Sequence, residues 1–340
     1  MVSLDEIRSS NARIATALPA GLVAVFLGGT GAVGGTSLRQ FAKHTVKPRI
    51  YFLGRSQESG DRIVAELKEL NPDGEYIFLS ADVSLLGAAD DVCGDIKSRE
   101  NHINLLFMTT GTLGTGEATA EGLDYGAAVS YYSRVRFIVN LLPLLQRAPS
   151  LRRVVTVLAG TKEGEINFDD FSGASLPMTQ LRGHLGSMTT LALESIALEA
   201  PDVSFVHSFP GSVKTNLGSD IKSAPMMVFR ALYKVLGPFI NIPYAEAGER
   251  QLFIATSARY PPKLGAGSTA GVPTTSGTTS SAGSNGELGS GVYSVNYDGE
   301  SAPPKVGELL MRLRADDVVR KLWLHTEEVF TRITGSTFVV

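Results

Sequence analysis

Short, almost continuous hydrophobic runs alternate along most of the chain with segments of helical periodicity. The runs expected to be strands cover residues 22–27, 49–54, 76–81, 103–108, 152–160 and 203–209. Because they do not alternate between apolar and polar positions, these strands are expected to be buried on both faces by helices. Between the second and third runs, residues 61–70 place their apolar side chains on one helical face. The pattern predicts an α/β fold: a Rossmann-type, doubly wound parallel sheet in three layers and a single domain.

The later part of the chain adds three features to this picture. A helix is expected over 131–145, ended or kinked by Pro143. Residues 1–263 hold the predicted sheet, and 292–340 resume with a strand and closing helices that complete the same domain. Between them, 264–291 is a low-complexity segment of almost only Gly, Ser, Thr, Ala and Pro. Because it can bury little apolar surface to offset its chain entropy, we expect a disordered insertion there.

Composition narrows the class of protein. The net charge of -3 argues against a nucleic-acid partner, which calls for a basic face. A single cysteine, Cys93, excludes an intrachain disulfide framework and fits a reducing compartment. Acidic residues precede any apolar run at the N-terminus, which makes a poor signal peptide. We therefore expect a soluble, cytoplasmic protein.

No segment has the 18 or more uncharged apolar residues of a membrane span. The closest is 225–243, which Arg230 and Lys234 interrupt. Three interpretations stay open for it: a mobile flap over a pocket, a helix on a membrane surface, or an ordinary core helix.

The first strand leads into a glycine-rich turn that opens a helix. Gly28, Gly31 and Gly34 fit the spacing GxxGxxG, and Gly29, Gly31 and Gly34 fit GxGxxG. Glycines here let backbone N–H groups approach a pyrophosphate at the helix N-terminus. The position after a buried strand predicts a dinucleotide-binding turn. Its expected contacts are Gly28, Gly29, Gly31, Ala32, Val33 and Gly34.

The end of the second strand indicates which dinucleotide is bound. An acid there would bind the adenosine ribose of NAD, whereas a cation would bind the 2′-phosphate of NADP. Arg55 follows the strand, and no acid lies between Pro48 and Gln57. An arginine suits a phosphate because its planar fork donates two parallel hydrogen bonds. The sequence therefore favours NADP(H) as the cofactor.

With these residues in place, the chain resembles short-chain dehydrogenases/reductases of the retinol-dehydrogenase-like and protochlorophyllide-reductase-like branch. The matching segments are 53–69, 81–86, 121–145, 164–171, 203–217 and 320–330. The resemblance implies that Asp82 and Val83 contact adenine, and that Val213 and Thr215 hold the nicotinamide carboxamide. It also places four further residues beside the cofactor: Thr110, Gly111, Pro210 and Gly211.

The catalytic residues that the resemblance implies are missing. Such enzymes use a tyrosine whose pKa is lowered by a lysine four residues later, with a serine and an asparagine beside them. Between the fifth and sixth predicted strands the chain has no tyrosine, and no lysine lies between Glu163 and Val213. Depending on alignment, the tyrosine position falls on His184 or one helical turn earlier. The asparagine position falls on Ser130, and the serine position falls within 158–160.

Three residues remain as catalytic candidates: His184, Ser130 and Ser187. His184 could exchange protons near neutral pH, or it could simply lie at the start of a helix. Ser187 could act as a nucleophile, although a helix N-cap is the favoured interpretation. His207 is expected to be a hydrogen-bonded core histidine. One cysteine and five scattered histidines offer no metal site.

Three functions fit these observations. The first is an NADP(H)-dependent reductase of a hydrophobic carbonyl or enone with unusual proton delivery. The second is a non-redox cyclase, isomerase or dehydratase on the same scaffold. The third is an NADPH-binding pseudoenzyme. A likeness to fungal members of the family implies secondary-metabolite biosynthesis, and the family implies a homodimer or homotetramer.

Overall fold

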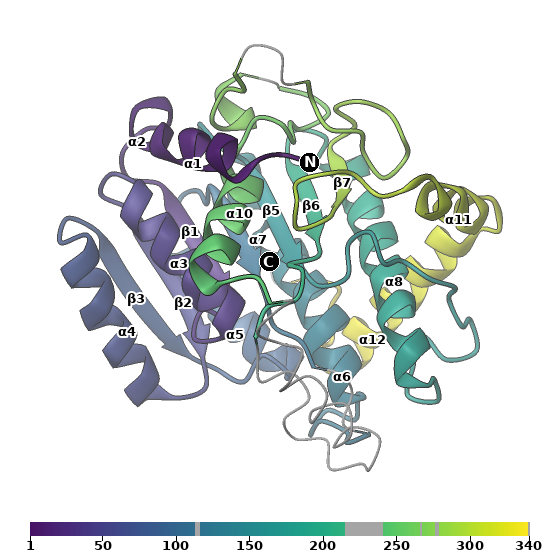
Figure 1. The fold of residues 1–340 in the computed structure, drawn as a ribbon. Coiled ribbons are helices and arrows are strands. Elements are labelled where there is room, and N and C mark those ends of the chain that lie inside the picture. Colours follow the sequence, from purple (N-terminus) through teal and green to yellow (C-terminus); the bar gives the residue numbers. More distant parts are fainter. Residues whose placement is uncertain (113–115, 215–240, 266, 276–278, 339–340) are drawn as a thin grey trace.

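Seven parallel strands form one sheet in the order β3-β2-β1-β4-β5-β6-β7 (Figure 1). The computed structural model describes residues 1–112, 116–214, 241–265, 267–275 and 279–338. Within them the strands are β1 (Val23–Leu27), β2 (Arg49–Gly54), β3 (Glu75–Ser80), β4 (Leu105–Met108), β5 (Arg153–Val157), β6 (Ser204–Ser208) and β7 (Val292–Val295). Every predicted strand is observed, with boundaries shifted by a few residues.

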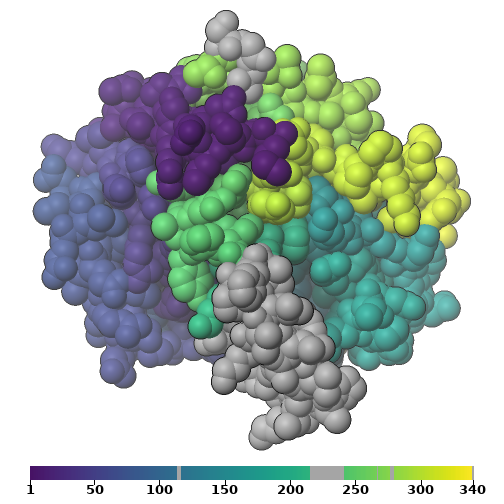
Figure 2. Space-filling model, viewed as in Figure 1, coloured from purple at the N-terminus to yellow at the C-terminus, as the bar shows by residue number. Residues whose placement is uncertain are grey.

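Helices cover both faces of this sheet, which confirms the predicted three-layer α/β fold. One face carries α1 (Leu4–Ala12), α3 (Ala32–His44), α4 (Gln57–Leu70) and α10 (Tyr244–Thr256). The other carries α5 (Leu86–Arg99), α7 (Ser133–Gln146), α8 (Met178–Glu199), α11 (Pro304–Ala315) and α12 (Val318–Thr334). Shorter elements are α2 (Ile14–Ala17), α6 (Tyr125–Ala127), the π-helix η1 (Ala128–Tyr132) and the 3₁₀-helix η2 (Ser268–Ala270). Figure 2 shows α1 in purple lying against α10 in green.

The order of the strands positions the site. From β1 the chain adds β2 and β3 on one side, then returns to add β4 to β7 on the other. The direction in which successive strands are added therefore reverses between β1 and β4, and the loops that follow these two strands lead to opposite sides. In open α/β sheets, ligands bind outside the carboxyl ends of the strands at such a reversal.

The helix expected over 131–145 is observed as η1 followed by α7. It passes through Pro143 and ends at Gln146, so the proline does not end it. A proline this close to the last turn removes one backbone donor, and Leu144 and Leu145 still pack in the core.

The low-complexity segment differs from the expected disordered insertion, because its described residues pack against the domain. The N–H of Leu151 donates to the carbonyl of Ser268, and that of Val272 donates to Thr256 at 2.7 Å. Ala270 and Val272 are buried. Backbone hydrogen bonds to neighbouring chain segments replace the apolar burial that the composition cannot supply.

The apolar stretch 225–243 lies mostly outside the described residues, so its three interpretations stay predictions. In the part of the chain that the structure describes, no helix is both long and apolar enough to cross a membrane.

Candidate cofactor and active site

The glycine turn between β1 and α3 has the shape that a bound pyrophosphate needs. Gly28 has a positive φ of 80°, and its carbonyl accepts a hydrogen bond from the N–H of Gly31 at 2.9 Å. A Cβ on Gly34 would lie 2.2 Å from that carbonyl oxygen, and a Cβ on Gly28 would lie 2.6 Å from Thr109 Oγ1. Only glycine therefore lets the helix begin this close to the strand.

The start of α3 leaves backbone donors available for an anion. Gly31 is its N-cap and makes no side-chain cap, so no side chain occupies the first-turn N–H groups. Ala32 is half-buried, whereas Val33 packs in the core and can contribute only its backbone. Gly29 lies against β2, where an added Cβ would be 3.0 Å from Phe52 Cβ. The turn fits the pyrophosphate of a dinucleotide.

Arg55 lies at the carboxyl end of β2, beside this turn. Gly54, just before it, packs under Thr30 of the turn. The Arg55 side chain is exposed, and its Nη1 donates a long hydrogen bond of 3.4 Å to the Tyr125 hydroxyl. A guanidinium in this position can reach a phosphate on the adenosine ribose.

At the end of β3, Asp82 is exposed and Val83 is half-buried. The Asp82 carboxylate accepts a hydrogen bond from the N–H of Ser84 at 3.0 Å, which fixes the turn into α5. Both residues lie at the same edge of the sheet as Arg55, where an adenine ring would be held.

The end of β4 forms the centre of this edge. Thr109 Oγ1 donates to the carbonyl of Leu27 at 3.1 Å and so ties β4 to β1. Thr110 Oγ1 donates to Val129 in η1, also at 3.1 Å. A Cβ on Gly111 would lie 3.5 Å from the Ser130 hydroxyl, which is fully buried and has no hydrogen-bond partner. Ser130 thus lies beneath Gly111, away from the surface.

After β6 the chain turns at Pro210 and Gly211, and Gly211 has a φ of 78°. A Cβ there would lie 2.3 Å from Ile242 Cδ1. Val213 is buried, so its backbone is what it can offer a cofactor. Thr215, the expected partner of the carboxamide, lies outside the described residues.

His184 is buried inside α8, and backbone groups occupy both of its ring nitrogens. Nδ1 accepts a hydrogen bond from the N–H of Asn167 at 3.1 Å, and Nε2 donates to the carbonyl of Phe171 at 3.0 Å. Burial lowers the pKa of His184, so it stays neutral with its proton on Nε2. This arrangement holds the segment between Asn167 and Phe171 and leaves no free nitrogen for proton transfer.

Ser187 lies in the middle of α8, so the prediction that it caps the helix is wrong. The helix begins at Met178 with Pro177 as its N-cap. Ser187 Oγ accepts from the N–H of Gly164 at 3.1 Å and donates to the carbonyl of the same residue at 2.5 Å. The three catalytic candidates are therefore buried in η1 and α8, and none of them forms a hydrogen bond with another.

Comparisons with known proteins agree with this geometry. No protein-family model matches the chain. It is 39% identical over 334 residues to the oxidoreductase AN1596 of Emericella nidulans, covering 97% of this chain and 98% of the relative. It is 30% identical over 353 residues to the short-chain dehydrogenase/reductase SAT2 of Stachybotrys chartarum, covering 96% of each. The chain belongs to the short-chain dehydrogenase/reductase family.

Solved structures share the fold. A complex of RhlG from Pseudomonas aeruginosa with NADP matches with a TM-score of 0.52 and 16% identity, covering 77% of this chain and 98% of that one. The protein described in this structure is therefore an oxidoreductase with a Rossmann-type site for a nicotinamide cofactor. The expected serine position just after β5 falls on Leu158, Ala159 or Gly160, none of which can donate a side-chain hydrogen bond.

Sequence reasoning missed a buried polar network under α8 of this short-chain dehydrogenase/reductase. Thr190 Oγ1 and Ser294 Oγ donate to Glu163 Oε1 at 2.8 and 2.6 Å. His207 Nδ1 lies 2.8 Å from Thr190 Oγ1, and its Nε2 accepts from the N–H of Ala159 at 3.0 Å. His207 must therefore donate through Nδ1, which confirms the predicted hydrogen-bonded core histidine.

Burial sets the charge of this network. It lowers the pKa of His207 to about 3 and raises the pKa of Glu163, whose Oε2 has no hydrogen-bond partner. No sequence signal marks Glu163, because it lies in a polar loop with the composition of a surface turn. Among the described residues, no group of three His, Cys, Asp or Glu side chains could hold a metal ion.

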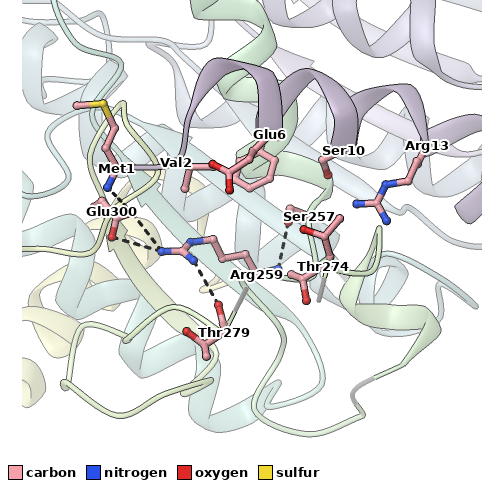
Figure 3. Close-up of a pocket in the computed structure, with 12 residues that line it drawn as sticks. Met1, Val2, Glu6, Ser10, Arg13, Ser257, Arg259, Thr274, Thr279 and Glu300 are labelled. Atoms are coloured by element: carbon pink, nitrogen blue, oxygen red, sulfur yellow. Dashed lines mark hydrogen bonds and ion pairs between the residues drawn. The ribbon is translucent and has the colours of Figure 1, made fainter. Parts of the chain in front are cut away.

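A cavity of about 220 Å³ lies at the other edge of the sheet, next to α1 (Figure 3). Arg259 crosses it and donates to Glu300 at 3.3 Å and to the carbonyl of Thr279, also at 3.3 Å. Ser257 lines the cavity, and its carbonyl binds Arg153 at the first position of β5. The cavity is therefore near the amino ends of the strands and is not part of the cofactor edge.

Proposed function

We propose that this protein is an NADPH-dependent reductase of a hydrophobic carbonyl or enone. The observation that carries the proposal is the pairing of the glycine turn with Arg55 at one edge of the sheet. The turn supplies backbone donors for the pyrophosphate, and Arg55 supplies the cation that a 2′-phosphate needs. Glu58, in the first turn of α4, is the acid closest to Arg55 along the chain, and Asp82 follows β3 rather than β2.

The chemistry of reduction divides between cofactor and protein. Bound NADPH supplies a hydride to the electrophilic carbon of the substrate, and a proton must reach the oxygen or the neighbouring carbon. Lys162 is a cation next to the ends of β5 and β6, and its Nζ lies 5.2 Å from the centre of the Phe209 ring. A half-buried ammonium there can donate a hydrogen bond to a substrate oxygen that gains negative charge.

The proposed substrate class and biological setting rest on the relatives and on apolar residues near the cofactor edge. Relatives from Emericella and Stachybotrys favour a role in fungal secondary-metabolite biosynthesis. The apolar side chains of Leu158, which is half-buried, and Val213, which is buried, favour a hydrophobic substrate. A homodimer or homotetramer stays a prediction.

One observation favours the alternative of a non-redox catalyst or an NADPH-binding pseudoenzyme. The polar side-chain atoms of His184 and Ser187 form hydrogen bonds with backbone groups, and Ser130 is buried. A site in which these three side chains offer no proton to a substrate suits a reaction in which orientation does most of the work. Cofactor oxidation in the presence of enone or ketone substrates separates this alternative from reduction.

The proposal is tested by titrating the purified full-length protein with NADPH and NADH and following cofactor fluorescence. We expect NADPH to bind at micromolar concentrations and more tightly than NADH. Arg55→Ala should weaken NADPH binding about tenfold and leave NADH binding unchanged, because one charge-assisted phosphate contact is lost.

Arg62→Ala is the matched control, since Arg62 is an exposed arginine on α4 that pairs only loosely with Glu66 at 3.9 Å. It should bind both cofactors like the unaltered protein. Absence of NADPH binding at micromolar concentrations would contradict both the reductase and the NADPH-sensing alternative.

A further inference from the structure

Arg134, near the start of α7, is a fully buried arginine at the cofactor edge. Its guanidinium donates to the carbonyls of Met108 and Val157 at 3.4 and 3.0 Å. It also donates to the carbonyl of Thr110 and to Thr156 Oγ1. The side chain thus joins the ends of β4 and β5 at the point where the cofactor edge lies.

All four acceptors are uncharged, and among the described residues no carboxylate forms an ion pair with Arg134. Arg136, two residues later, shows the usual arrangement: its Nε and Nη2 bind the two oxygens of Asp90 at 2.6 and 2.7 Å. Burial lowers the pKa of Arg134 to about 9, and the group is still protonated at neutral pH. Placing an unpaired cation in the interior is costly, and its field is weakly screened there.

The charge lies directly below the floor of the site. A Cβ on Gly111 would be 3.7 Å from Arg134 Nη2, so one glycine separates the guanidinium from the open edge. The pyrophosphate turn is at β1, and Arg55 marks the adenosine end at β2. The nicotinamide end must then extend in the opposite direction, over β4, β5 and β6.

We propose that Arg134 makes the site select the reduced cofactor over the oxidised one, an inference that rests on the proposed NADP(H) site. The dihydronicotinamide ring of NADPH is neutral, whereas the nicotinamide ring of NADP⁺ carries a positive charge. A buried cation beneath the ring repels only the oxidised form. The site is therefore expected to bind NADPH more tightly than NADP⁺ and to release NADP⁺ more readily.

A purely structural role for Arg134 makes a different prediction, and Arg153 provides the comparison. Arg153 is also fully buried and donates only to carbonyls, those of Ile254, Ser257 and Ala270, at 3.0, 3.1 and 2.8 Å. It lies at the amino end of β5, at the edge away from the cofactor. Both arginines support the sheet, but only Arg134 lies below the nicotinamide end.

The test is calorimetric titration of the full-length protein with NADPH, NADP⁺, the neutral analogue tetrahydro-NADP, and adenosine 2′,5′-bisphosphate. We expect the unaltered protein to bind NADPH and tetrahydro-NADP at least about tenfold more tightly than NADP⁺. Arg134→Met should reduce this preference about tenfold and leave adenosine 2′,5′-bisphosphate binding unchanged. Arg134→Lys should keep most of the preference, and Arg153→Met should keep all of it.

Any of the following results would overturn the inference. Equal binding of NADPH and NADP⁺ by the unaltered protein does so, even if Arg134→Met fails to fold. Binding of tetrahydro-NADP at the level of NADP⁺ does so too, because charge would then not be the cause. An unchanged preference in folded Arg134→Met, or an equal loss in Arg153→Met, leaves only a structural role. Absence of NADPH and adenosine 2′,5′-bisphosphate binding is the separate failure of the proposed function.

Discussion

Gly34 shows how single residues decide whether the cofactor edge can form. Its missing side chain lets α3 start against the carbonyl of Gly28, where a Cβ would lie only 2.2 Å away. Gly94, on α5, has no atom within 4 Å of the corresponding position. Replacing each glycine by alanine therefore distinguishes the effect of close packing, at Gly34, from the effect of helix propensity, at Gly94.

We expect Gly34→Ala to weaken NADPH binding at least about tenfold and to lower the melting temperature by several degrees, since the turn must shift. Gly94→Ala should keep NADPH binding and leave stability unchanged or raised. Fluorescence titration and thermal unfolding measure both effects. Unaltered NADPH affinity in Gly34→Ala would show that the turn does not hold the cofactor.

At the scale of elements, α8 and the loop after β5 contact each other backbone to backbone. The N–H of Gly164 donates to the carbonyl of Gly183 at 2.9 Å, and a Cβ on Gly183 would lie 2.9 Å from Gly164 Cα. This close contact, together with the Ser187 bonds to Gly164, fills the space beside α8 with the chain's own loop.

We expect Gly183→Ala to lower the free energy of unfolding by about 2 kcal/mol, because neither backbone segment can move aside easily. Gly307→Ala, in α11, meets no atom within 4 Å and should raise it by about 0.5 kcal/mol. Urea denaturation checks both values. If Gly183→Ala behaved like Gly307→Ala, the contact between α8 and the loop would not be tight.

The start of α8 also shows where element prediction fails. Ser187 has the residue type of an N-cap and precedes an amphipathic run, so the sequence favoured a helix start there. The helix begins at Met178, and residues 184–193 are buried. A helix buried on nearly all sides has no polar face, and its periodicity gives no clear boundary.

For the whole molecule, buried histidines make stability depend on pH. Burial lowers the pKa of four of them, His44, His184, His207 and His325. Each is neutral in the folded state and gains a proton more readily when unfolded. Their contribution is present above pH 6.5 and is lost as the pH falls toward their folded pKa, about 3 for His207.

We therefore expect the melting temperature to fall between pH 7 and pH 5. Glu163 opposes the fall, because its raised pKa means that stability is lost as pH rises. His325→Gln should make the fall smaller, because it removes one of the histidines whose pKa is lowered. Thermal unfolding at both pH values is the measurement, and a melting temperature that rises on acidification would contradict the expectation.

The sequence by itself determined the sheet, its two helical layers and the glycine turn. These depend on local properties, namely continuous apolar runs, helical periodicity and the positive φ of Gly28. The absence of a Tyr-Lys pair was also readable from the sequence alone. Arg55 was found because it directly follows a strand.

Only the tertiary structure decided which polar groups are buried and paired. Ser294 reaches Glu163 from 131 positions away, and Arg134 binds carbonyls of two strands. It likewise paired both nitrogens of His184 with backbone groups and packed the described residues of the low-complexity segment against the domain. Burial and hydrogen-bond partners come from distant segments, so no local pattern of residues specifies them.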